Sequence, residues 1–188
     1  MALLAETLVD EWLNRQGFFT VRGVKDGVSE IDLLGIRPVS GGLEAWHVEV
    51  QTSFRPIGYI APLSADQLDG FAKSRTSAKI RPPDVMEQAI DGWVSKKFSS
   101  RRKVQFRDRA WPGLSWRFVF VHALVKDERE LAFIAARGVE LVPFHKVLNE
   151  LHHGLSDVRG NAGTDISEIV EYFATHGVSP SLPKSRGQ

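Results

Sequence analysis

The sequence contains no cysteine, which removes disulfides, thiolate nucleophiles and cysteine-based zinc sites from consideration. Any metal ion must therefore be held by carboxylate, imidazole or carbonyl groups. The chain also lacks an apolar run of the roughly 18 to 20 residues that span a bilayer. Its first apolar residues, 1–5, are followed by Glu6 without a basic start or a cleavage site. We expect a cytoplasmic protein with no membrane partner.

An excess of charge of either sign is also missing, because the formal net charge is only +1. The overall charge therefore neither favours nor excludes nucleic acid as a partner, and the distribution of charge has to decide. The chain has 188 residues, 43% of them hydrophobic and 25% charged, which is typical of a soluble globular protein with a substantial core. We expect a single domain over residues 1–176. Residues 177–188, rich in proline, serine, lysine and glycine, are expected to form a flexible tail.

Two neighbouring segments carry the pattern around which the chain is organised. In residues 45–53 apolar and polar side chains alternate, which is the period of a β-strand, so Glu49 and Gln51 are expected on one face. Residues 29–36 have the composition of an apolar strand that is interrupted by one acid, Asp32. A short connection rich in turn-forming residues favours an antiparallel hairpin. Asp32 is then expected beside Glu49.

An aspartate, about fifteen residues and then Glu-x-Gln on a neighbouring strand resembles the motif of the PD-(D/E)xK nuclease superfamily. The resemblance extends from about residue 1 to about residue 153 and implies an α/β fold with a restriction-endonuclease-like core. In that core a mixed central β-sheet, made of an antiparallel hairpin and a parallel βαβ part, is flanked by helices. The resemblance also implies a Mg²⁺ site, which Mn²⁺ can share, formed by Asp32, Glu49 and the main-chain carbonyl of Val50. Gln51 stands at the position where most members have lysine. Some type II restriction endonucleases of the superfamily also have glutamine at this position.

The first helix is expected at residues 3–16, because Leu8, Trp12 and Leu13 fall on one arc at helical spacing. Glu6 lies at the edge of this arc. The resemblance implies that a glutamate of the first helix joins the metal site, and Glu6 is the candidate by position. A solvated acid in the first turn, favoured by the helix dipole, explains Glu6 equally well.

The rest of the chain is expected to complete the sheet and its helical layers. The strands expected at 116–125 and 139–144 enclose a helix that starts near Asp127, and this order predicts a parallel pair. A further strand is expected at 18–24. Further helices are expected at 64–74, 85–98, 145–153 and 164–176.

Seven basic residues within fourteen positions form a local excess of positive charge in an otherwise balanced sequence. They are Lys96, Lys97, Arg101, Arg102, Lys103, Arg107 and Arg109. Aromatic side chains are interleaved with them, which favours contact with the phosphates of a nucleic acid. A solvated surface is the alternative, and such a run carries no sequence specificity by itself.

These features predict a metal-dependent endonuclease that hydrolyses phosphodiester bonds of DNA, with RNA left open as a substrate. Asp32 and Glu49 are expected to bind the metal, Gln51 to position water or phosphate, and Glu6 to assist. Because Gln51 lacks the charge of lysine, a second hypothesis is a nuclease-derived domain that has lost catalysis and binds nucleic acid or serves assembly. A small-molecule enzyme fits less well, since the chain has no glycine-rich phosphate loop and no serine or cysteine nucleophile motif. A homodimer is expected by analogy with nuclease domains of this size.

Overall fold

The structure is a computed structural model that describes residues 2–27, 29–56, 58–68, 71 and 74–153. Its helices and strands are α1 (Ala2–Arg15), β1 (Phe19–Asp26), β2 (Ser29–Val39), β3 (Gly42–Gln51), α2 (Pro83–Val94), the π-helical segment η1 (Ser95–Ser99), α3 (Arg101–Ala110), β4 (Trp116–His122), α4 (Arg129–Ala135), β5 (Val139–Pro143) and α5 (Phe144–His153). The helix expected at 164–176 and the tail expected at 177–188 lie outside the described residues. None of the described helices is both long and apolar enough to cross a membrane.

The five strands form one mixed sheet in the order β1-β2-β3-β4-β5. β1, β2 and β3 pair in antiparallel fashion, whereas β3 pairs with β4, and β4 with β5, in parallel. The connection between β4 and β5 contains α4, which confirms the predicted strand–helix–strand unit. The predicted α/β class, with a mixed sheet flanked by helices, is therefore confirmed.

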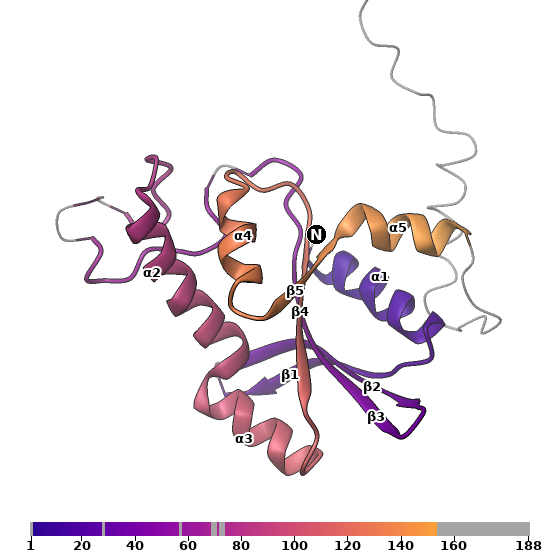
Figure 1. Ribbon diagram of the computed structural model, residues 1–188. Coiled ribbons are helices and arrows are strands. Elements are labelled where there is room, and N and C mark those ends of the chain that lie inside the picture. Colours follow the sequence, from indigo (N-terminus) through magenta and orange to yellow (C-terminus); the bar gives the residue numbers. More distant parts are fainter. Residues whose placement is uncertain (1, 28, 57, 69–70, 72–73, 154–188) are drawn as a thin grey trace, which may run out of the picture.

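Helices cover both faces of the sheet, with α1 and α5 on one side and α2, α3 and α4 on the other (Figure 1). The alternation of side chains along each strand sorts them between the two layers. On β3, Val48 and Val50 pack into a core with buried apolar residues of α1 and α5. On β4, Phe120 packs on the opposite face against Met86 and Trp93 of α2. Residues of β3 with odd numbers, including Glu49, therefore face the layer that contains α2 and α3.

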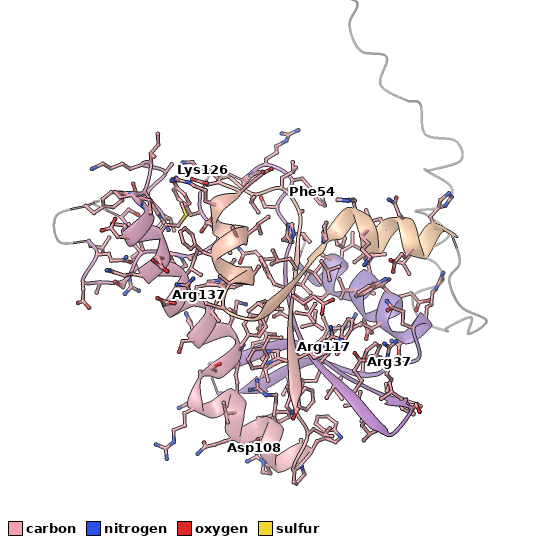
Figure 2. All side chains as sticks on the ribbon, in the orientation of Figure 1. Arg37, Phe54, Asp108, Arg117, Lys126 and Arg137 are labelled. Carbon is pink, nitrogen blue, oxygen red and sulfur yellow. The ribbon has the colours of Figure 1, made fainter. Side chains whose placement is uncertain are left out.

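Ion pairs at the surface link neighbouring elements of this framework. Arg117 of β4 binds Glu44 of β3 at 2.7 Å and Glu140 of β5 at 2.6 Å, so one guanidinium spans three strands (Figure 2). Arg137, which follows α4, pairs with Asp91 of α2 (Figure 2). Exposed pairs of this kind contribute little stability, so the two apolar layers carry most of it.

The predicted helix at 64–74 is wrong, because the described residues of that range form turns and bends. Ser64 and Gln67 do make the reciprocal hydrogen bonds of a helix start, with the Gln67 N–H donating to Ser64 Oγ at 3.3 Å and the Ser64 N–H donating to Gln67 Oε1 at 3.0 Å. The Gln67 side chain also donates to the carbonyl of Val85 at 2.8 Å, which ties this turn to α2. A capping pattern therefore occurs here without a helix after it, and the glycine at position 70 of the sequence does not favour continuation.

The region after residue 94 also differs from the prediction. The helix expected at 85–98 starts at Pro83, in the first-turn position that proline favours, and becomes π-helical after Val94. Ser100, with φ −59° and ψ 142°, interrupts the helical path, and α3 begins at Arg101. The sequence pattern predicts no helix at 101–110, because the inward side of α3 carries the basic residues Lys103 and Arg107 in place of an apolar stripe.

Candidate functional site

Asp32 of β2 and Glu49 of β3 lie on the same face of the sheet. The antiparallel register pairs Leu33 with Val48, so the next opposite pair in the same register is Asp32 and Glu49. Directly opposite residues project to one side of the two strands. Both acids are buried, with 9% of Asp32 and 1% of Glu49 exposed. Two buried acids on adjacent strands require positive charge nearby.

Lys97, from the π-helical segment η1, supplies a positive charge between the two acids. Its Nζ lies 2.6 Å from Oε2 of Glu49 and 4.0 Å from Oδ2 of Asp32. The Lys97 side chain is 30% exposed, so its ammonium lies where the acid pair meets the surface. The two carboxylates thus converge on one cation position that solvent can reach.

A second cation and a histidine hold the other oxygen of Glu49. Oε1 accepts hydrogen bonds from Nζ of Lys103 at 2.5 Å and from Nε2 of His47 at 3.0 Å. Lys103 lies on α3 and is almost fully buried, as is His47, two residues before Glu49 on β3. Oε1 of Glu49 is therefore bound by the buried side chains of Lys103 and His47, and Oε2 is bound by the partly exposed Lys97.

The position of Arg107 assigns the tautomer of His47. Its Nη1 lies 2.6 Å from Nδ1 of His47 and also donates to the carbonyl of Phe98 at 2.8 Å. A guanidinium has no acceptor, so Nδ1 of His47 must accept and the ring proton must be on Nε2, which then donates to Glu49. Burial lowers the pKa of His47 to about 4, in spite of the attraction of Glu49, so the imidazole is neutral at neutral pH.

The two acids of the site have opposite pKa shifts. Burial raises the pKa of Asp32 to about 7, and the charge of Glu49 adds to this, against the opposing effects of Lys97 and the Val50 N–H. Burial also favours a higher pKa for Glu49, but the hydrogen bond from His47 and the charges of Lys97 and Lys103 outweigh it and lower that pKa to about 2. Glu49 is thus ionised at neutral pH while Asp32 exchanges its proton there. Opposed shifts in one pair of acids are a mark of functional sites, although structural networks produce them as well.

The other residues predicted for the metal site are placed differently. The N–H of Val50 donates to Oδ2 of Asp32 at 2.8 Å, and its carbonyl points to the same edge of the strand, as the two groups of one β residue do. Gln51 is exposed at the end of β3. Glu6 belongs to α1, which packs on the opposite face, and its charge is the smallest of the five influences on the pKa of Asp32.

The structure divides the predicted basic run into two groups. Lys97, Lys103 and Arg107 point inward and contact Glu49 or His47. The other four side chains are exposed: Lys96, Arg101, Arg102 and Arg109. The run therefore belongs partly to the buried site, and the exposed group forms the part of it that lies on the outer surface.

His47 and Lys97 belong to this site, although the sequence motif does not include them. His47 could have been found, because it shares the period-two face of Glu49 on one strand. Lys97 and Glu49 are 48 positions apart, and no local spacing relates them. Lys103 and Arg107 are four residues apart and share a helix face, but this signal required α3 to be recognised as a helix.

A Mg²⁺ ion at this position would have few protein ligands. Oδ1 of Asp32 receives no hydrogen bond from the part of the chain that the structure describes, and Oε2 of Glu49 binds a cation already, the ammonium of Lys97. Within the described ranges, no three His, Asp or Glu side chains are grouped to hold a metal. Mg²⁺ commonly takes one or two carboxylates and keeps several waters, so two carboxylates and the Val50 carbonyl suffice. Lys97 would have to move away from Glu49.

Comparisons with known proteins leave the function open. No known protein-family model and no curated protein matches this chain. A crystal structure described as a protein of unknown function, AF1548, is similar at 11% sequence identity with a TM-score of 0.46, over 91% of this chain and 79% of that chain. Similarity at this level carries no argument about activity, so the function has to be argued from the site.

Proposed function

We propose that the protein is a metal-dependent nuclease that hydrolyses phosphodiester bonds of DNA, related to the PD-(D/E)xK superfamily. The observation that carries this proposal is the convergence of Asp32 and Glu49, from adjacent strands, on the ammonium of Lys97. Two carboxylates that could hold a divalent cation, next to a lysine ammonium, would suit phosphodiester hydrolysis, since cations must neutralise the charge around the phosphate.

Each side chain of the site has a defined task in this proposal. Asp32 and Glu49, with the Val50 carbonyl, would hold Mg²⁺, which when bound polarises the phosphate and lowers the pKa of a bound water. His47 and Lys103 keep Glu49 ionised and fix its orientation. Once the ammonium of Lys97 has moved away from Glu49, it donates hydrogen bonds to the anionic phosphate. Lys97 thus supplies the positive charge that Gln51 lacks. The glutamine at the third motif position is then compatible with catalysis.

Cleavage assays with matched variants test this proposal. Supercoiled, linear and branched DNA are incubated with the protein under Mg²⁺ or Mn²⁺, and the products are separated on gels. Asp32→Asn, Glu49→Gln and Lys97→Met are each expected to lower the rate by about 100-fold or more, because each removes charge at the reacting phosphate. Lys146→Met is the matched control, since Lys146 is an exposed lysine on α5 and the opposite face of the sheet. Equal rates for Lys97→Met and Lys146→Met would contradict the role of Lys97.

A binding domain without catalysis is the second candidate, and one observation favours it. Both oxygens of Glu49 are already occupied by lysine ammonium groups, as in an ion cluster that replaces a metal. In that case the wild type binds DNA but cleaves none of the substrates with either metal. Circular dichroism of each variant separates a lost activity from a lost fold.

A further inference from the structure

A hollow of about 380 Å³ lies at the end of β3 and is connected to the acid pair through one shared side chain, that of Lys97. Lys97 belongs to both places, because it lines this hollow and also contacts the two carboxylates. Gln51, at the end of the same strand, lies on the boundary between this hollow and a neighbouring one of about 340 Å³. A ligand in the first hollow can therefore contact the same lysine that contacts the acids of the proposed cleavage site.

The lining combines three kinds of side chain. Buried Leu63, Ala89 and Trp93 contribute apolar atoms. Exposed Arg75 and Lys96 add positive charge at the rim. Uncharged amides complete the lining, from Gln51 and Gln88. An apolar surface, cations and neutral hydrogen-bonding groups in one hollow match the three parts of a nucleotide, which are the flat base, the phosphate and the polar edge of the base.

We infer that this hollow binds one unpaired nucleotide next to the phosphate held at the acid pair, so that the substrate is single-stranded or locally unpaired nucleic acid. The position of that phosphate rests on the proposed nuclease function. A volume of about 380 Å³ lies within the range of small-molecule sites, which is enough for one nucleotide. A base in an intact duplex is stacked and paired inside the helix, so it cannot enter a hollow without leaving the stack.

The same inference gives a reason for glutamine at position 51. The amide of Gln51 both donates and accepts hydrogen bonds, whereas a lysine ammonium only donates. Base edges present donors and acceptors side by side, and amide side chains can pair with both. Gln51 thus serves to hold the nucleotide, while Lys97 provides the positive charge at the phosphate.

Binding measurements without metal test this site independently of cleavage. Fluorescence anisotropy in EDTA compares a short labelled single strand with the duplex of the same sequence. The matched pair of variants is Gly92→Phe and Gly92→Ala, because Gly92 lines the hollow and a Cβ atom added there meets no atom within 4 Å. Gln51→Ala tests the same hollow from β3 and leaves α2 unchanged.

The wild type is expected to bind the single strand more tightly than the duplex. Gly92→Phe and Gln51→Ala are expected to weaken single-strand binding by about tenfold, which is the usual effect of losing the contacts of one base, while Gly92→Ala binds as the wild type does. Equal affinities of the wild type for both forms, or an unchanged single-strand affinity of Gly92→Phe and Gln51→Ala, would overturn the inference. If instead the nuclease proposal is wrong, the protein still binds the single strand more tightly than the duplex, but it cleaves neither after metal is added.

Discussion

At the scale of single residues, Asp32 is a side chain whose burial costs the protein stability. Its pKa of about 7 in the folded protein lies above the ordinary value of 3.8. The folded state therefore binds this proton more tightly than the unfolded state, so the contribution of Asp32 to stability is present at acid pH and is lost as the pH rises toward 7. An energetic penalty retained at a buried acid is typical of a functional position, where activity and stability conflict.

We predict that Asp32→Asn stabilises the metal-free protein above pH 7. The amide has no charge to bury and its oxygen can still accept the hydrogen bond from Val50, so the free energy of unfolding should rise by about 1 to 3 kcal/mol. Urea denaturation in EDTA at pH 8 and pH 4 measures this difference. At pH 4 the gain should vanish, because Asp32 is then protonated in the folded wild type. A variant less stable than the wild type at pH 8 would contradict the assigned burial penalty.

His47 gives a second prediction at this scale. Because Arg107 donates to Nδ1 and Glu49 accepts from Nε2, we expect the neutral Nε2–H tautomer at neutral pH. Nitrogen-15 spectra of the imidazole groups should show Nε2 protonated and Nδ1 unprotonated for this residue. His47→Gln identifies its signals by their disappearance. A protonated Nδ1 would mean that Arg107 or Glu49 does not hold the ring as the structure places it.

At the scale of elements, the strands are easier to predict from the sequence than the helices that complete the site. Period-two alternation and a short turn give the β2–β3 hairpin, and with it the meeting of Asp32 and Glu49. The wrong helix at 64–74 follows from a capping pattern that the fold uses in a turn. α3 has no apolar stripe, because its inward residues Lys103 and Arg107 bind the buried acid and histidine on β3. A helix of this kind can be recognised in the sequence only when the buried acid that its basic residues bind, here Glu49, is already known.

The division of α3 into inward and outward cations predicts two separate effects. Arg101 and Arg102 are exposed, so the double variant Arg101→Gln/Arg102→Gln should weaken DNA binding and flatten its dependence on salt, with little change in stability. Lys103→Met leaves Glu49 with less compensation and should lower the free energy of unfolding by about 2 to 4 kcal/mol. Binding isotherms at several salt concentrations and urea denaturation measure the two effects. If the salt dependence of DNA affinity is unchanged in the double variant, the exposed basic residues do not contact phosphates and are only solvated.

At the scale of the whole molecule, the two faces of the sheet have different tasks. The face under α1 and α5 is an apolar core, whereas the face under α2 and α3 combines an apolar core with the buried charges of the site. The site therefore rests on a framework whose other layer does not depend on it. Changes at the site can alter stability by a few kcal/mol while the fold persists, which makes the stability of the whole chain a usable measure of events at the site.

Metal binding can be followed in this way, because an ion that binds only the folded state raises the melting temperature of the whole protein. A metal at the proposed site would compete with Lys97 for Oε2 of Glu49, so the ammonium would weaken metal binding in the absence of nucleic acid. We predict that Lys97→Met gains more thermal stability from Mn²⁺ or Mg²⁺ than the wild type does, although it cleaves DNA far more slowly. Asp32→Asn is the control and should gain less than the wild type, since it loses a ligand charge. If neither metal shifts the melting temperature of Lys97→Met, the acid pair is not a metal site and the binding-domain alternative is favoured.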